Sequence, residues 1–76
     1  MSISKGQILE GTVTGITKFG AFIELGTGET GLVHISEVAD TYVKDVNEFL
    51  KEKDVVKVKV INVDDSGKIG LSIRQA

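Results

Sequence analysis

The sequence contains no cysteine, no proline and no tryptophan, and it has a single histidine among its 76 residues. Without cysteine, neither a disulfide framework nor a thiolate metal site is available. One histidine leaves few ways to pair a nucleophile with a general base, which argues against an enzyme. No apolar run approaches the roughly 20 residues of a membrane span, and the first residues lack the apolar core of a signal peptide. We therefore expect a cytoplasmic protein without enzymatic activity, cofactor, metal or membrane contact.

An excess of basic residues is also missing, because nine lysines and arginines face eleven aspartates and glutamates, for a formal charge of −2. Affinity for a phosphate backbone comes largely from basic side chains, so the chain is not a generic polyanion binder. Net charge does not say where the charges lie, and a local basic patch remains compatible with it. The length fits one domain, which we expect to span residues 6–76 after a short N-terminal extension of residues 1–5.

Five segments have the composition and alternation of β-strands. They are residues 7–17, 20–25, 30–35, 55–63 and 68–74. Gly11 and Gly15 interrupt the first segment, and such glycines mark bends or bulges. A bent first strand can pair with both sheets of a small barrel. The absence of proline leaves every segment free to form a strand.

Between the third and fourth segments, residues 45–51 have helical spacing of Val46, Phe49 and Leu50, with Asp45 as the expected cap. We expect one helix of about two turns here, with Phe49 in the core. Five strands with a helix between the third and fourth is the order of the OB-fold, an all-β Greek-key barrel with antiparallel strands. Its second and third strands form a binding face for oligonucleotides or oligosaccharides.

Alternation along residues 20–25 puts Phe22 on the same face as Glu24 and opposite Ile23. The face with Glu24 is the solvent face, so Phe22 presents a large ring to water. Small domains rarely expose such a ring without a use for it, and exposed rings on a strand form stacking platforms for single-stranded nucleic acid. By the same alternation His34 lies on the Phe22 face. The simpler alternative is that Phe22 lies flat on the barrel wall and covers apolar surface.

Four motifs, at residues 6–13, 19–23, 31–37 and 67–74, together resemble the RNA-binding domain that is repeated in ribosomal protein S-one and that also ends polynucleotide phosphorylase. The resemblance runs from about Gly6 to Arg74. The chain is also similar to small stand-alone bacterial proteins of this type, including general stress proteins, which often continue into a polar or basic tail. The resemblance implies an OB-fold that binds single-stranded RNA.

The resemblance also implies an RNA face, whose positions match Phe19, Phe22, His34, Asp64 and Lys68. Gly70 departs from the family, since many relatives have a longer side chain there, and it offers the face only backbone. Tyr42, Lys18 and Arg74 are further candidates, for stacking and for guiding the RNA backbone.

Each candidate also has a simpler interpretation. Phe19 could wedge into the end of the barrel, and Asp64 could be only a turn former. Lys18, Lys68 and Arg74 could be ordinary solvated residues.

The preferred hypothesis is a monomeric module that binds single-stranded RNA with weak sequence preference and micromolar-class affinity. By resemblance, its partners would include the ribosome or messenger RNA, and its role would be to modulate translation or RNA turnover. The alternative is an OB-fold module whose exposed face binds a protein or a sugar.

Overall fold

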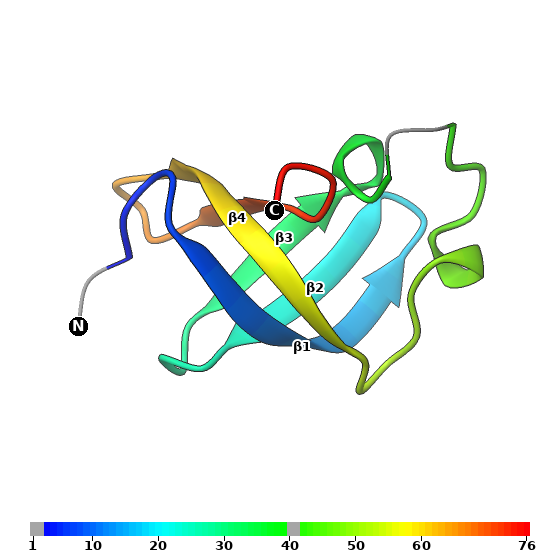
Figure 1. The fold of residues 1–76 in the computed structure, drawn as a ribbon, viewed down its shortest axis with the longest axis horizontal. Coiled ribbons are helices and arrows are strands. Elements are labelled where there is room, and N and C mark those ends of the chain that lie inside the picture. The colour runs from blue at the N-terminus through cyan, green and yellow to red at the C-terminus, as the bar shows by residue number, and fades with distance from the viewer. Residues whose placement is uncertain (1–2, 40–41) are drawn as a thin grey trace.

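Five strands form a closed barrel in the computed structural model, which describes residues 3–39 and 42–76 (Figure 1). The strand order around the barrel is β1-β2-β3-β5-β4. The strands are β1 (Ile8–Thr17), β2 (Gly20–Leu25), β3 (Thr30–His34), β4 (Val55–Val63) and β5 (Ile69–Ser72). This architecture confirms the predicted five-stranded all-β OB-fold.

One pairing differs from the expectation of antiparallel strands throughout. β3 and β5 run parallel, with Leu32 opposite Gly70 and Val33 opposite Leu71, and this short pair closes the barrel. The other strand pairs are antiparallel. After β3, a long connection leads to β4, which pairs with β1 and not with β3. β5 then occupies the position between β4 and β3 and runs parallel to β3.

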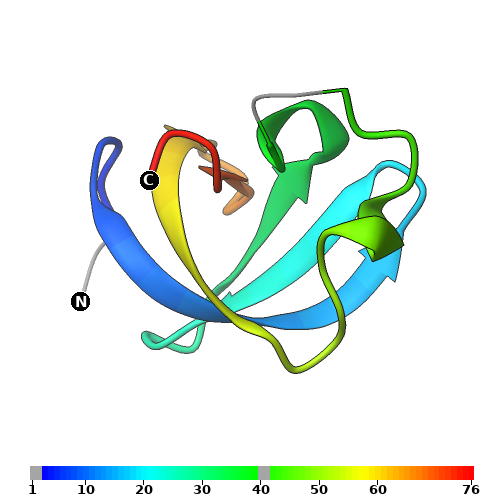
Figure 2. The same cartoon turned by 45° about the vertical axis from the view of Figure 1, so that its right-hand side comes forward.

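β1 bends as the glycines in it predicted, and it pairs with both β2 and β4. The register with β2 shifts between Val13 and Gly15, which marks a bulge. At Gly11 an added Cβ would collide with the side chain of Ile23, so only glycine allows this close approach. Figure 2 shows β1 curving around one side of the barrel.

Alternating residues of the strands fill the interior, as predicted. Ala21, Ile23 and Leu25 of β2 are buried, and so are Val58 and Val60 of β4. Val33 and the β5 residues Ile69 and Leu71 belong to the same cluster. The remaining members are Val13, Val38, Val43, Val46 and Leu50. Because these side chains point inward, the intervening ones on each strand point outward.

The predicted helix of two turns is wrong in length and type. The described part of the connection from β3 to β4 contains two single 3₁₀ turns, η1 (Ile35–Glu37) and η2 (Val46–Glu48). The cap is confirmed, because the Asp45 carboxylate accepts the backbone N–H of Asn47 at 3.0 Å. The seven-residue segment is too short to repay the cost of helix nucleation by itself. Asp40 and Thr41, between η1 and η2, lie outside the described residues.

The core assignment of Phe49 is also wrong, because this residue is 45% exposed. Val46 and Leu50 of the same segment are buried, as expected. Phe49 is the residue at which the chain leaves the 3₁₀ turn. Helical spacing therefore does not determine where the Phe49 side chain points, and the ring is only partly buried.

Candidate nucleic-acid interface

A row of residues crosses four strands on the outer face of the barrel. Phe22 of β2 lies opposite Leu32 of β3, Leu32 lies opposite Gly70 of β5, and Gly70 lies opposite Asn62 of β4. Residues paired in this way share one face of the sheet and lie within contact distance of their neighbours. All four line a groove of about 510 Å³. Gly70 has no side chain, so its backbone forms the floor between Leu32 and Asn62.

Two apolar side chains form one wall of this groove. Phe22 is 43% exposed and Leu32 is 37% exposed. A Cβ on Gly15 of β1 would lie 3.6 Å from Cδ2 of Phe22, so the ring rests against the bent part of β1. One part of the ring therefore packs on the barrel while the other faces the groove. The ring is thus only partly covered, and its exposed part is available to a ligand.

Polar residues close the two ends of the groove. His34 and Glu37 line it where β3 ends, and Thr30 lines it where β3 begins. Asp64 and Lys68, from the turn between β4 and β5, line it as well. Four of the five residues that the resemblance assigned to the RNA face therefore border one groove, and these four are Phe22, His34, Asp64 and Lys68.

Phe19, the fifth residue, lies in the turn between β1 and β2 and outside the set that lines the groove. Its ring is 64% exposed, so it does not wedge into the barrel end. The ammonium of Lys18 lies 5.3 Å from the centre of this ring, within the range of a cation–π contact. The Phe19 carbonyl accepts the backbone N–H of Ile35 at 2.8 Å, which puts Phe19 beside the His34 end of the groove.

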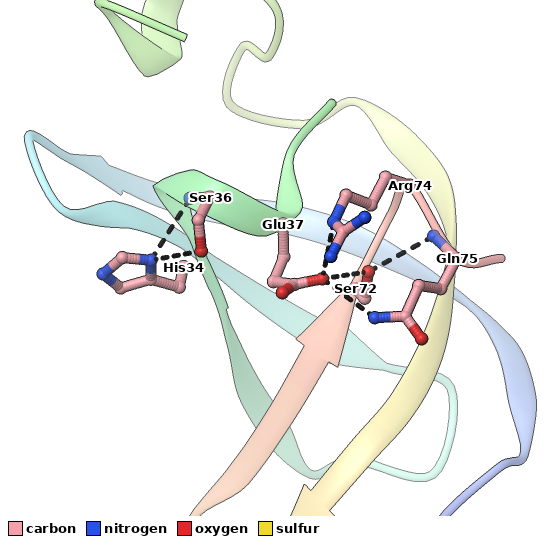
Figure 3. A network of polar contacts seen from close by, with 6 residues as sticks. All are labelled: His34, Ser36, Glu37, Ser72, Arg74 and Gln75. Atoms are coloured by element: carbon pink, nitrogen blue, oxygen red, sulfur yellow. Dashed lines mark hydrogen bonds and ion pairs between the residues drawn. The ribbon is translucent and has the colours of Figure 1, made fainter. Parts of the chain in front are cut away.

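His34 has a fixed ring orientation because it caps η1. Its Nδ1 accepts the backbone N–H of Ser36 at 3.2 Å and lies 2.8 Å from the Ser36 hydroxyl oxygen (Figure 3). Since Nδ1 is an acceptor, the neutral ring carries its proton on Nε2. Figure 3 shows this second nitrogen pointing away from η1. His34 therefore presents an N–H donor on a flat ring.

Glu37 joins η1 to the end of β5 (Figure 3). Its Oε1 accepts hydrogen bonds from the Ser72 hydroxyl at 2.7 Å, from Arg74 Nε at 3.1 Å and from Gln75 Nε2 at 3.1 Å. The bond from buried Ser72, and then those from Gln75 and Arg74, lower the pKa of Glu37. Arg74, predicted as a further RNA contact, thus makes an ion pair with Glu37.

Asp64 shapes the turn between β4 and β5. Its carboxylate accepts the backbone N–H of Ser66 at 3.2 Å, and its own N–H donates to the Lys68 carbonyl at 2.8 Å. Gly67 has φ of +91°, a conformation that glycine adopts without strain. The bond from Ser66, with a smaller contribution from the charge of Lys68, lowers the pKa of Asp64. Asp64 is therefore a turn former, and it also brings a negative charge beside Lys68 at the groove.

Leu32 and Asn62 line the groove but were not predicted as site residues. Leu32 is two residues before His34 on the same strand, so alternation was a sufficient signal for it. Asn62 gave no such signal, because alternation from Val60 would turn it inward. A register shift of β4 against β5 between Val60 and Asn62 turns it outward instead. Tyr42, 85% exposed, is not among the groove residues.

Among residues 3–39 and 42–76, no helix has the length and apolar character needed to cross a membrane. The same residues include no group of three or more histidine, cysteine, aspartate or glutamate side chains arranged to hold a metal ion.

Comparison with known proteins gives consistent matches. The family described as the S1 RNA binding domain matches residues 2–74. The Bacillus subtilis protein YabR is 67% identical over 76 residues, which are 100% of this chain and 59% of YabR. The solution structure of GSP13 from Bacillus subtilis matches with a TM-score of 0.91 and 49% identity, over 97% of this chain and 58% of GSP13.

An archaeal structure is equally similar in fold. A chain in the crystal structure of the a/eIF2alpha–aDim2p–rRNA complex from Pyrococcus horikoshii OT3 matches with a TM-score of 0.93 and 41% identity. That match covers 99% of this chain and 46% of the archaeal one. The present chain thus spans about half the length of these relatives, from 46% of the archaeal chain to 59% of YabR. With the family matched over residues 2–74, this chain belongs to the S1 RNA-binding domain family.

Proposed function

We propose that the groove formed by Phe22, Leu32, Gly70 and Asn62 binds single-stranded RNA. The observation that carries this proposal is the half-exposed Phe22 ring, which stands beside Leu32 above a floor without a side chain. A nucleobase can stack on this ring and extend over Leu32, since every base has a flat face. Duplex RNA does not offer its base faces, so the proposed ligand is an unpaired strand.

Polar groups around the groove fit the rest of a nucleotide. Lys68 supplies a cation for a phosphate, and His34 supplies an N–H donor from Nε2 for a phosphate or ribose oxygen. The Phe19 ring lies beyond the His34 end and provides a second platform. Lys18 above that ring would remain near the phosphate of a base stacked there. The path of the strand would therefore run from Lys68 past Phe22 toward Phe19.

The expected affinity follows from these few contacts. Each base stacked on an aromatic ring contributes about 1–3 kcal/mol, and two stacks with a few polar contacts give micromolar-class binding. Stacking accepts any base, so sequence preference should be weak for the strand as a whole. Few phosphates are neutralised, so the affinity should decrease only gently as the salt concentration rises.

The proposed cellular role is association of the domain, as a monomer, with ribosomal or messenger RNA, so that it modulates translation or RNA turnover. The family match supports RNA as the ligand. A similar chain occurs in a complex that contains ribosomal RNA, which supports a ribosomal target in particular. We propose no enzymatic activity, metal or cofactor for this site.

A titration followed by backbone amide chemical shifts tests the function. Unlabelled single-stranded RNA of about ten nucleotides is added to ¹⁵N-labelled protein, and the same sequence as a duplex is added in parallel. We expect shifts at Phe22, Leu32, His34 and Lys68 with the single strand and much smaller ones with the duplex. No shift with either RNA, or shifts confined to the Phe49 side, would refute RNA binding in the groove. That result would favour the alternative of a protein-interaction module.

A further inference from the structure

Alternation would place the polar Asn62 on the apolar inner side of β4, and an irregularity in the strand turns it outward. Val60 pairs with Leu71, and Asn62 pairs with Gly70, so β4 advances by two residues while β5 advances by one. The extra residue is Ile61, and the bulge reverses the alternation that buries Val58 and Val60. Bulges of this kind re-aim side chains next to functional sites. Here the effect is to bring an amide into the groove.

Gly70 keeps the space in front of that amide open. A Cβ at position 70 would lie 3.2 Å from the Asn62 Cβ, closer than ordinary packing allows. Any larger side chain there would press on Asn62 and fill the gap between Asn62 and Leu32. The expectation that Gly70 only removes contacts is therefore incomplete, since its missing side chain also makes room for a ligand. A base that stacks on Phe22 and extends over Leu32 and Gly70 directs one edge at Asn62.

Among the charged groups that line the groove, two are hydrogen-bond acceptors and Lys68 is a donor. An asparagine amide offers one donor and one acceptor side by side, which matches N7 and the amino group of adenine. The two carboxylates that line the groove, Glu37 and Asp64, only accept hydrogen bonds when ionised. The hydrogen bonds described above lower the pKa of both groups, which keeps them ionised near neutral pH. Carboxylates attract an exocyclic amine and repel a carbonyl oxygen.

We propose that Asn62 reads the edge of one base held over Gly70, and that this position prefers adenine to uracil. Adenine offers an amine to the amide and the carboxylates, whereas uracil offers two carbonyl oxygens and, as its one donor, the N3–H between them. The proposal rests on the RNA binding proposed above, and it adds a single discriminating position to a strand otherwise bound by stacking. One such contact in an open groove corresponds to a preference on the order of fivefold.

The test compares two oligomers that differ at one base, an all-uridine octamer and the same octamer with one central adenosine. Their affinities for the parent protein are measured by fluorescence anisotropy. We expect the adenosine oligomer to bind on the order of fivefold more tightly. A third oligomer, with purine riboside in place of adenosine, keeps the ring system but lacks the amine. It should bind like the all-uridine oligomer.

Asn62→Leu removes the hydrogen-bonding atoms at nearly constant shape, and it should reduce the ratio of affinities to about one. Asn47→Ala, an amide bonded to Asp45 away from the groove, is the matched control and should keep the parent ratio. The inference would be overturned if folded Asn62→Leu kept the parent ratio of affinities, or if the parent bound the adenosine and all-uridine oligomers equally well. Neither result would contradict the proposed RNA binding. Absence of any RNA binding would refute both.

Discussion

Phe22→Ala is the substitution that probes the groove most directly, and Phe49→Ala is its matched control. The two rings have nearly equal exposure, 43% for Phe22 and 45% for Phe49. Phe22 lines the groove, and Phe49 follows η2 and does not line it. A comparison of the two variants therefore separates the loss of a partly packed ring from the loss of a surface that binds RNA.

Both variants should lose similar stability. A phenylalanine ring buries roughly 150–250 Å² when it is fully covered, so a ring that is a little over half covered removes about 100 Å² from water. At about 25 cal/mol per Å² this corresponds to about 2.5 kcal/mol, an upper value because the unfolded chain also covers part of the ring. We expect a decrease of about 1–2 kcal/mol in the free energy of unfolding for each variant, measured by urea denaturation.

Binding of RNA should distinguish the two variants. Loss of one stack costs about 1–3 kcal/mol, so Phe22→Ala should raise the dissociation constant for an RNA oligomer by roughly 5- to 150-fold. Phe49→Ala should leave this constant unchanged. The measurement is fluorescence anisotropy with a labelled single strand, at protein concentrations where both variants are fully folded. Phe22→Tyr, which keeps the ring, should bind like the parent.

Two results would refute the reasoning. One is a folded Phe22→Ala variant that binds as tightly as the parent, since the stack would then contribute nothing. The other is an equal loss of affinity in Phe22→Ala and Phe49→Ala, since that would assign the effect to stability or to a different surface. Weaker binding in Phe22→Ala alone supports stacking in the groove.

Two more predictions concern charge. Lys68→Gln should weaken RNA binding at low salt and make the plot of log affinity against log salt shallower by about 0.7, the value for one phosphate on a single strand; an unchanged slope would exclude a phosphate contact by Lys68. The pKa of Glu37 is lowered by hydrogen bonds from Ser72, Gln75 and Arg74, so its stabilisation is present above about pH 4.3, the ordinary glutamate value, and is lost as the pH falls below it. The free energy of unfolding, measured by urea denaturation, should therefore decrease less from pH 7 to pH 3 in Glu37→Gln than in the parent. An equal decrease in both proteins would contradict stabilisation by the ionised Glu37 carboxylate.

Alternation was sufficient to predict most of the barrel. Period-two patterns on β2 and β4 located the buried residues, because a strand with one face in the core has only one register that buries its apolar side chains. The same rule put Phe22 and His34 on one outer face, and the structure brings both to one groove. The strands were therefore recognised from local residue order alone.

Residues whose direction depends on irregular backbone could not be predicted in this way. Phe49 had the spacing of a buried helical residue, but the segment forms only a single 3₁₀ turn and ends at that position. Asn62 had the spacing of a core residue, but a bulge reverses the alternation before it. A bulge depends on the partner strand, here on the room that Gly70 leaves opposite Asn62. Neither effect is encoded in the residue's own neighbours along the chain.

The distribution of charge explains how a chain with a net charge of −2 can serve as an RNA-binding domain. Among the described residues that line the groove, Lys68 is the one lysine or arginine, and Glu37 and Asp64 are acidic. A site of this composition gains little from phosphate attraction, so the aromatic wall has to supply most of the affinity. Under the proposed function, repulsion by the two carboxylates should reduce binding to duplex RNA and to other polyphosphates. For a single strand, stacking of a base on Phe22 should offset this repulsion.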